Sequence, residues 1–449
     1  MSDLTLSNHH QNLLKRLITF SIPLILSGIL QQLYSWTDAF ILGHVVGEGA
    51  LAATGCVSVI TSFYILVLTG FTSGLNILSA RYFGEGRTDA QKEILLHFNL
   101  ILGGFFTLLS VLTLLFTEPI LHLLDTPSDI FTDADLYLKI SLAGIPFLTV
   151  YDVYAAVLRG IGDSKTPFYG ILFSSVSNIL LDLLFVIKFQ QGVSGAAAAT
   201  VLSQVLLCVF MILYTIRRYP SLRYSLRAFH PNPTLFREGC TLSLPITVQS
   251  AVTSVGNLVL QAFMNGFGTA TVAAITTAYR VDCIILLPLV NLGTAVSTLV
   301  SQAVGAKKPK QATATLLTGS VLTAGISLLL TGFVFAFGGD LIALFGVSAP
   351  SVAIGYDFFR AIAIFYPIFG LATAMRGYIE GIGAVLWSAC FGIASLLLRI
   401  ALSYALVPFF GNMVIAYAEG FSWCFLCFVY AAICARFVHK NRTTAKKEL

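Results

Sequence analysis

The sequence predicts an all-α integral membrane protein of about twelve spanning helices, arranged as two similar halves. Three observations predict this fold class: the composition, a regular series of apolar runs, and an internal repeat. Charged residues make up 10% of the 449 residues and hydrophobic residues 57%, whereas a soluble domain carries about 25% charged residues. At about 20 apolar residues per crossing, the chain has room for roughly twelve helices and for no large soluble domain.

Apolar runs separated by polar breaks predict the spans in order along the chain. Six runs fall in the first half, near residues 17–42, 51–79, 94–117, 136–158, 168–189 and 194–216. Six more fall in the second half, near residues 240–266, 271–302, 313–338, 356–379, 385–409 and 413–437. The first run follows Lys15 and Arg16 and continues without a small-residue cleavage site, so we expect a first span and not a signal peptide.

Basic residues alternate between the two sides of the predicted membrane. Lysines and arginines gather in every second break and near both ends of the chain, while the intervening breaks carry mostly acids, such as Glu118 and Asp125. Because loops rich in Lys and Arg stay in the cytoplasm, we expect both termini in the cytoplasm and the chain in the inner or plasma membrane of a bacterial cell. Topology therefore explains the formal net charge of +5, and we expect no nucleic-acid partner.

The chain is predicted to contain two six-helix bundles, residues 1–220 and 239–449, joined by a cytoplasmic linker at residues 221–238. The segment from Arg217 to Glu238 combines five arginines with three prolines between two apolar blocks. Its arginines fit the positive-inside pattern, and they could also bind anionic lipid head groups.

An offset of about 221 residues superimposes the two halves. Pro146 then meets Pro367, and the Gly-Ile-Gly motif at residues 160–162 meets the same motif at residues 381–383. Each half has six spans that begin and end on one side, so the repeats are parallel and related by an axis along the membrane normal. We therefore expect a substrate to bind between the halves, near the midplane.

Carboxylates within the spans are candidate functional groups, because an ionised carboxylate at bilayer depth costs about 2.5–3.5 kcal/mol on insertion scales. Asp38 and Asp182 are the leading cases, on spans one and five. Asn178 lies one helical turn before Asp182, and Thr200 follows on span six. Their oxygens would suit Na+, but two nearby carboxylates would also share a proton. The coupling ion, Na+ or H+, stays open. The same groups would otherwise serve only as polar contacts between helices.

Several segments resemble the multidrug and toxic compound extrusion (MATE) family over nearly the whole chain. They are Pro23 through Asp38 to Gly43, Gly74 to Gly84, its second copy ending at Gly305, and Arg159 to Asp163. The run from Asn178 to Asp182, followed by Gly195 and Thr200, is similar to the DinF-like branch in particular. The resemblance implies two pseudo-symmetric six-helix bundles of the MATE/MOP type. It also implies ion-coupled, alternating-access export of mainly cationic organic compounds or drugs; we expect a monomer without a cofactor.

Other polar residues in the spans are candidates for the substrate cavity. They are Gln31, Tyr137, Gln249, Arg280, Glu380 and Arg399. Arg399 and Glu380 are candidates for a cavity or gating role; the alternative is that they anchor helix ends or form ion pairs. Arg280 and Asp282 are two residues apart and point to different helical faces, so we expect each to find another partner. Tyr137 would serve equally well as an aromatic residue of the membrane interface.

The second half has no acid where the repeat aligns it with Asp38 and Asp182. Leu260 or a neighbour, and Ser403, occupy those positions. Some members of the family that the sequence resembles carry functional acids in spans seven and ten. Here span seven offers Gln249, and span ten offers only Asp357 near its outer end. We therefore expect the ion-binding chemistry in the first half.

Prolines within the spans predict built-in bends, because each removes a backbone hydrogen bond. They are Pro23, Pro146, Pro245, Pro288 and Pro367. Pro23 is interpreted as a hinge that lets span one bend when Asp38 exchanges its ion.

Other function classes fit the sequence less well. The G-x-G-x-x-A pattern at residues 47–52 lies between two spans and follows no strand, and there is no Walker motif, nucleophile elbow or H-E-x-x-H motif. We therefore expect neither an enzyme nor an ATP-driven pump. A lipid-linked precursor flippase of the same superfamily is the alternative, but it would need more cavity cations than Arg280 and Arg399. The duplicated layout argues against a channel.

Overall fold

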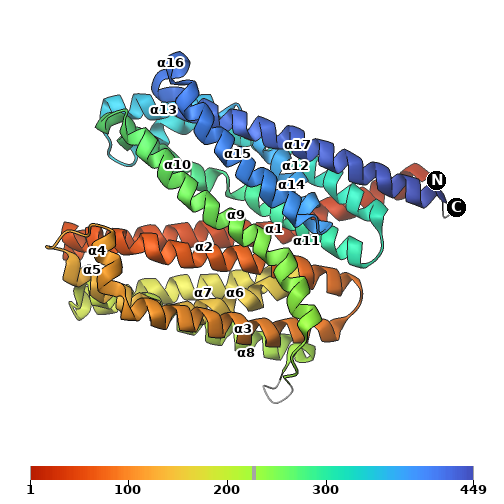
Figure 1. Cartoon of the computed structure of the whole chain (residues 1–449), viewed down its shortest axis with the longest axis horizontal. Helices are drawn as coiled ribbons and strands as arrows, with labels where there is room; N and C mark the ends of the chain where they lie inside the picture. Colours follow the sequence, from red (N-terminus) through yellow and green to blue (C-terminus); the bar gives the residue numbers. More distant parts are fainter. Residues whose placement is uncertain (1, 225–228, 448–449) are drawn as a thin grey trace. The chain divides into compact units, whose positions relative to one another are not determined.

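Apolar runs fold into long helices throughout the computed structural model, which describes residues 2–224 and 229–447 of the chain. In the first half the helices are α1 (Ser2–Ile41), α2 (Glu48–Gly84), α3 (Thr88–Leu115), α4 (Thr117–Leu123), α5 (Phe131–Leu142), α6 (Ile145–Gly160), α7 (Lys165–Asp182) and α8 (Gly192–Arg218). In the second half they are α9 (Pro233–Asn265), α10 (Thr269–Ile285), α11 (Leu287–Gly305), α12 (Pro309–Ala343), α13 (Ala349–Ala363), α14 (Tyr366–Gly381), α15 (Val385–Ala405), α16 (Val407–Phe410) and α17 (Val414–Lys447). Figure 1 shows these helices coloured along the chain.

Within the described residues, ten helices are long and apolar enough to cross a membrane. Two bent pairs also qualify, α5 with α6 at 43° and α13 with α14 at 51°, which gives up to twelve spans. This finding confirms the predicted all-α membrane fold. The predicted span near residues 271–302 is divided at Leu286, because α10 ends at Ile285 and α11 begins at Leu287 with Pro288 in its first turn.

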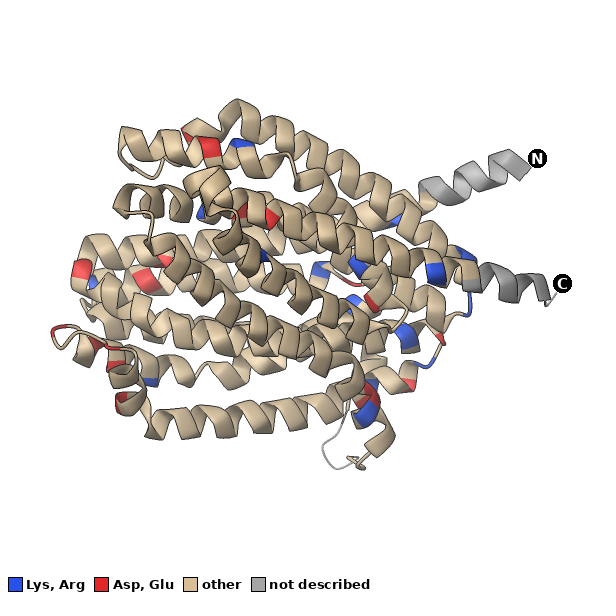
Figure 2. Ribbon diagram, turned by 45° about the horizontal axis from the view of Figure 1, so that its top comes forward, with Lys and Arg blue, Asp and Glu red and all other residues tan. Residues whose placement is uncertain are grey.

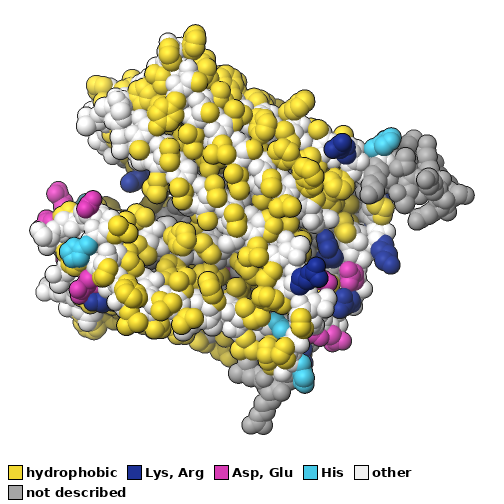
Figure 3. Space-filling view, in the orientation of Figure 1, with side chains coloured by type: hydrophobic (Ala, Val, Ile, Leu, Met, Phe, Trp, Pro, Cys, Tyr) yellow, Lys and Arg dark blue, Asp and Glu magenta, His cyan; other side chains and the backbone are white. Residues whose placement is uncertain are grey.

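The helices present large apolar side chains to their surroundings. Val321 and Leu329 of α12 are each 75% exposed, and Phe428 of α17 is 77% exposed. Figure 3 shows hydrophobic side chains over most of the visible helical surface, with charged side chains near the helix ends. Figure 2 shows Lys and Arg concentrated near one end of the helices. Exposed apolar surface of this extent fits lipid as the surrounding solvent.

Contacts divide the chain into two units that do not follow the midpoint of the sequence. The N-terminal unit contains residues 26–247, and the C-terminal unit contains the residues up to Ile25 together with those from Val248 onward. Helices α1 and α9 each contribute to both units. The predicted boundaries at residues 220 and 239 describe where the sequence repeats meet and stay a prediction; residues 225–228 of the predicted linker, with Arg227, lie outside the described residues.

The sequence repeat recurs in the packing inside each unit. In the N-terminal unit, α6 packs on α2, and the Ser79 hydroxyl donates to the Val157 carbonyl at 3.0 Å. In the C-terminal unit, α14 packs on α11, and the Ser301 hydroxyl donates to the Gly381 carbonyl at 3.1 Å. Gly160 and Gly381 end these helices and leave room for close approach, as in other membrane helix pairs.

The five prolines act in two different ways. Pro146, Pro288 and Pro367 lie in the first turns of α6, α11 and α14, where a missing N–H costs little. Pro23 and Pro245 instead lie inside the continuous helices α1 and α9. The unit boundary falls two residues after each of them. Only these two are therefore placed to bend a helix in its interior.

Candidate functional site

The candidate ion-binding residues all belong to the N-terminal unit. Asp38 lies in the last turn of α1, and Asp182 is the last residue of α7. Asn178 lies one turn earlier on α7, and Thr200 lies on α8, which packs against α7. Asp182 is fully buried, Asn178 is 1% exposed, and Asp38 and Thr200 are half-buried.

Both acid-bearing helices change to π-helix beside the acid. The π-helical turn η1 covers Leu42–Val46 directly after α1, and η2 covers Leu183–Lys188 directly after α7. The two π-helical turns contact each other. An apolar core that includes Leu42 and Val186 packs beneath them. Such π-turns occur frequently at functional sites, because they turn a side chain away from the regular helical register.

The two carboxylates and two tyrosines form one cluster. Asp38 lies within electrostatic range of Asp182. Tyr34 lies near both carboxylates and beside Thr200. Tyr137 of α5 lies near the same carboxylates and packs against the Leu42 core. The structure thus brings together every predicted ion-binding residue and places Tyr34 and Tyr137 beside them. We name these six residues the acid cluster (Tyr34, Asp38, Tyr137, Asn178, Asp182 and Thr200).

Most polar atoms of the acid cluster make no hydrogen bond. Within the described part of the chain, no partner is found for Asp38 Oδ1, Asn178 Oδ1 and Nδ2, Asp182 Oδ1 and Oδ2, or Thr200 Oγ1. Buried polar atoms are normally paired, and each exception needs an explanation. Five of these six atoms are oxygens, the ligands that a hard cation such as Na+ prefers. A proton on one carboxyl would equally satisfy part of the set.

The helix that carries Asn178 and Asp182 is fixed at its first turn by Asp163. Asp163 Oδ1 accepts hydrogen bonds from the backbone N–H of Lys165 and of Thr166, each at 3.0 Å. Its Oδ2 accepts from the Tyr219 hydroxyl at 2.8 Å. Burial, together with this hydrogen bond, raises the pKa of the Tyr219 phenol, so the tyrosine stays a donor at physiological pH. Asp163 therefore acts as a cap that positions α7.

Of the predicted cavity residues, Gln31 and Tyr137 belong to the N-terminal unit and differ in setting. Gln31 is exposed on α1, two turns before Asp38. Tyr137 belongs to the acid cluster, which favours a role there over one at the membrane interface. A cavity role for either residue stays a prediction.

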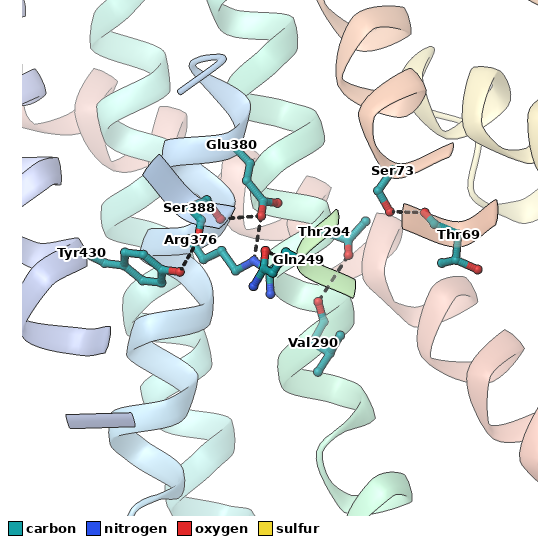
Figure 4. Close-up of polar contacts among 9 residues, drawn as sticks. All are labelled: Thr69, Ser73, Gln249, Val290, Thr294, Arg376, Glu380, Ser388 and Tyr430. Atoms are coloured by element: carbon teal, nitrogen blue, oxygen red, sulfur yellow. Dashed lines mark hydrogen bonds and ion pairs between the residues drawn. The ribbon is translucent and has the colours of Figure 1, made fainter. Parts of the chain in front are cut away.

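Arg399 and Glu380 do not pair with each other, and a cavity or gating role for them stays a prediction. Arg376 lies one turn before Glu380 on α14, and its Nε donates to Glu380 Oε1 at 2.6 Å. Arg376 Nη2 also donates to Gln249 Oε1 at 3.3 Å, and the Ser388 hydroxyl donates to Glu380 Oε1 at 2.8 Å (Figure 4). Glu380 therefore already has a near cation on its own helix.

Arg399 instead pairs with Glu419 of α17, at 2.8 Å between Nη2 and Oε2. The prediction that Asp282 finds a partner other than Arg280 is confirmed, because Asp282 accepts a hydrogen bond from the Tyr366 hydroxyl. Arg280 itself is exposed on α10. Pairings of this kind depend on helix rotation, which hydropathy alone does not determine.

Sequence reasoning missed Tyr34 and Arg376 as site residues. Tyr34 precedes Asp38 by four residues, so helical spacing places it on the same face. Arg376 precedes Glu380 by four residues in the same way. The four-residue spacing could therefore have identified Tyr34 and Arg376 as neighbours of Asp38 and Glu380.

Comparison with known proteins finds relatives whose sequences are similar to most of this chain. The family model described as MatE matches residues 23–184 and 245–405. The probable multidrug resistance protein YpnP of Bacillus subtilis strain 168 is 30% identical over 383 residues, which are 84% of each chain. The probable multidrug resistance protein NorM of Thermotoga maritima is 25% identical over 378 residues, 83% of this chain and 81% of the relative.

Solved structures share the fold at low sequence identity. The Vibrio cholerae MATE transporter VcmN has a TM-score of 0.90 at 18% identity, and the match covers 96% of this chain and 98% of that chain. A MOP superfamily transporter from Pyrococcus furiosus has a TM-score of 0.88 at 22% identity, over 95% of this chain and 96% of that chain.

Proposed function

The chain belongs to the MatE family of transporters, and from this we propose that it exports drug molecules across a membrane in exchange for Na+ or H+. The names of its relatives support multidrug export. The acid cluster supports ion coupling. Organic cations are the proposed substrates, and the proposed setting is a bacterial plasma membrane with both termini in the cytoplasm and a monomeric chain.

The unpartnered oxygens of the acid cluster carry the proposal. A buried carboxylate without a partner is costly, so an ion that enters the cluster stabilises the conformation in which these oxygens converge. Asp38 is on α1, whereas Asp182 and Asn178 are on α7, so a bound ion links the two helices. Release of the ion removes that link and lets α1 move. A substrate that favours the unlinked conformation is then exchanged for the ion, which is the requirement for antiport.

Reconstituted proteoliposomes test the proposal directly. Efflux of a fluorescent organic cation is measured under a Na+ gradient alone and under a pH gradient alone, for the wild type and for Asp38→Asn. We expect one gradient to drive wild-type efflux and Asp38→Asn to lose at least about ten-fold in rate, because the neutral amide cannot exchange a proton or balance the charge of Na+.

Asp129→Asn is the matched control, since Asp129 is an exposed acid outside the acid cluster. Its efflux should equal that of the wild type. Gradient-driven efflux that Asp38→Asn leaves intact would contradict the assignment of the acid cluster. Wild-type efflux that responds to neither gradient would contradict ion coupling itself.

A further inference from the structure

A second group of buried charges lies in the C-terminal unit, on four helices. Arg399 of α15 donates to Glu419 of α17 at 2.8 Å and to the Tyr279 hydroxyl of α10 at 2.7 Å. The Tyr279 hydroxyl donates to Glu419 at 2.9 Å. The Tyr366 hydroxyl of α14 donates to Asp282 of α10. We name these five residues the arginine network.

The arginine network has one more carboxylate than cation. Arg399 forms its ion pair with Glu419, whereas no ion pair within the described residues involves Asp282. Asp282 is 4% exposed and Glu419 is 8% exposed. With all three groups ionised, the buried network would carry a net charge of −1. An uncompensated charge at such a site is strongly unfavourable, so Asp282 needs a proton or a cation when the protein rests in this conformation.

Asp282 and its partner Tyr366 lie beside the two breaks in this unit. Asp282 is one turn before Leu286, where α10 gives way to α11, and the Leu286 N–H donates to the Asp282 carbonyl at 2.9 Å. Tyr366 begins α14 directly after the break that follows α13. Broken helices in transporters place ion sites at bilayer depth. The neighbouring Cys283 is exposed, so this part of α10 reaches the surface of the unit.

The internal repeat aligns Arg399 with a residue of the acid cluster. The offset that superimposes Gly160 on Gly381 also superimposes Asn178 on Arg399 and Asp182 on Ser403. The C-terminal unit therefore carries a fixed positive charge where the N-terminal unit carries an ion-binding amide. Its carboxylates instead are Asp282 and Glu419, which the repeat aligns with Thr61 and Ala198 and not with an acid of the acid cluster.

We propose that the Asp282 carboxyl, held by Tyr366 within the arginine network, is a proton-binding site of this transporter, separate from the acid cluster. The inference rests on the proposed ion-coupled export, since only coupling gives such a site a role in transport. The groups that interact with Asp282 are Tyr279 and Cys283 on α10, Tyr366 on α14, Arg399 on α15 and Glu419 on α17.

A proton fits this site better than Na+. Arg399 is within electrostatic range of Asp282 and would repel a second cation. A proton binds to one carboxylate oxygen, converts Asp282 to a neutral acid, and leaves the Arg399–Glu419 pair intact. Its release to water restores the carboxylate and the net charge of −1, which weakens this conformation relative to one that opens the network to water.

Infrared titration of the purified protein tests the proposal without transport. The C=O absorption of protonated carboxyl groups is followed over neutral pH for the wild type, Asp282→Asn and Asp38→Asn. We expect a titrating component that Asp282→Asn abolishes and that Asp38→Asn retains. Asp340→Asn is the matched control, because Asp340 is exposed on α12, and it should retain the component. An Asp282→Asn spectrum that titrates like the wild type would overturn the proposal.

Tyr366→Phe provides a second test that keeps the carboxyl in place. The phenol donates to the carboxylate and so favours its ionised form. Its removal should therefore move the titration midpoint of the same component to higher pH by about one unit. A midpoint that stays within the error of the wild type would contradict the proposed site even if Asp282→Asn failed to fold. If wild-type efflux responded to neither the Na+ gradient nor the pH gradient, the proposed function would be contradicted, but the infrared titration could still be interpreted.

Discussion

At the residue scale, the acid cluster shows how a few unpaired atoms define a site. Asp38, Asn178 and Asp182 were expected from the cost of burying polar groups in a span. The sequence could not reveal that most of their polar atoms lack partners, because partners depend on the rotation of each helix. The π-helical turns η1 and η2, which follow the two acids, were also not predicted, since a single inserted residue leaves the hydropathy pattern almost unchanged.

Tyr34→Phe is expected to weaken coupling without changing the fold. Its hydroxyl lies beside Thr200 and near both carboxylates. Loss of the contact that this hydroxyl would make with a bound ion, about 1–1.5 kcal/mol, should lower ion-driven efflux about five- to ten-fold. Efflux in proteoliposomes as a function of ion concentration measures this effect, which should appear as a weaker apparent ion affinity.

Tyr404→Phe serves as the matched control for this prediction, because Tyr404 is 57% exposed on α15. An unchanged apparent ion affinity in Tyr34→Phe would show that the hydroxyl takes no part in ion binding.

At the element scale, the repeat is most visible where helices approach each other closely. The α6–α2 and α14–α11 pairs use glycines that the repeat aligns, Gly160 with Gly381, whereas their bonding serines lie one position apart, because Ser301 aligns with Ala80 and not with Ser79. These spans were predictable because hydropathy is a local property of the sequence. The partners of Arg399 and Glu380 were not, since they depend on which helical faces meet.

Gly160→Ala should destabilise the N-terminal unit. A Cβ atom at Gly160 would meet the Ser79 hydroxyl and lie 2.8 Å from the Ala80 nitrogen. Overpacking of this kind costs about 1–3 kcal/mol, so thermal unfolding in detergent should begin at a lower temperature.

Gly104→Ala on α3 is the matched control, because nothing lies within 4 Å of its Cβ position. Alanine there should be neutral or stabilising by up to about 1 kcal/mol. Equal unfolding temperatures for the two variants would show that the α6–α2 contact tolerates a methyl group.

At the scale of the whole molecule, the two units share a scaffold but differ in chemistry. Twelve spans in two repeated halves were predictable, because the apolar composition and the offset of about 221 residues between the halves can be recognised along the entire chain. The division of α1 and α9 between the two units could not be predicted, since hydropathy places a unit boundary only in a polar segment. The proposed acid cluster and arginine network give the two units different means of responding to ions.

Pro23→Ala and Pro245→Ala should slow transport. Each proline lies inside a continuous helix, two residues before the unit boundary. Alanine restores a backbone hydrogen bond and straightens the helix, so we expect the efflux rate to fall several-fold while substrate affinity and unfolding temperature are maintained. Initial rates at saturating substrate measure the change.

Pro127→Ala, in the segment between α4 and α5, is the control and should transport at the wild-type rate. If Pro245→Ala also transported at that rate, the symmetric interpretation of the two hinges would fail and only α1 would remain a candidate.

The shared membership of α1 and α9 also bears on how the chain is made. A ribosome synthesises the residues up to Ile25 well before the rest of their unit, which begins at Val248. The N-terminal unit can assemble as soon as residue 247 has emerged, whereas the residues up to Ile25 must wait until the segment from Val248 onward has been made. A gene cut between residues 224 and 229 would yield two fragments, neither with a complete unit. Co-expressed, the fragments should complement each other, because each holds the segment that the other lacks.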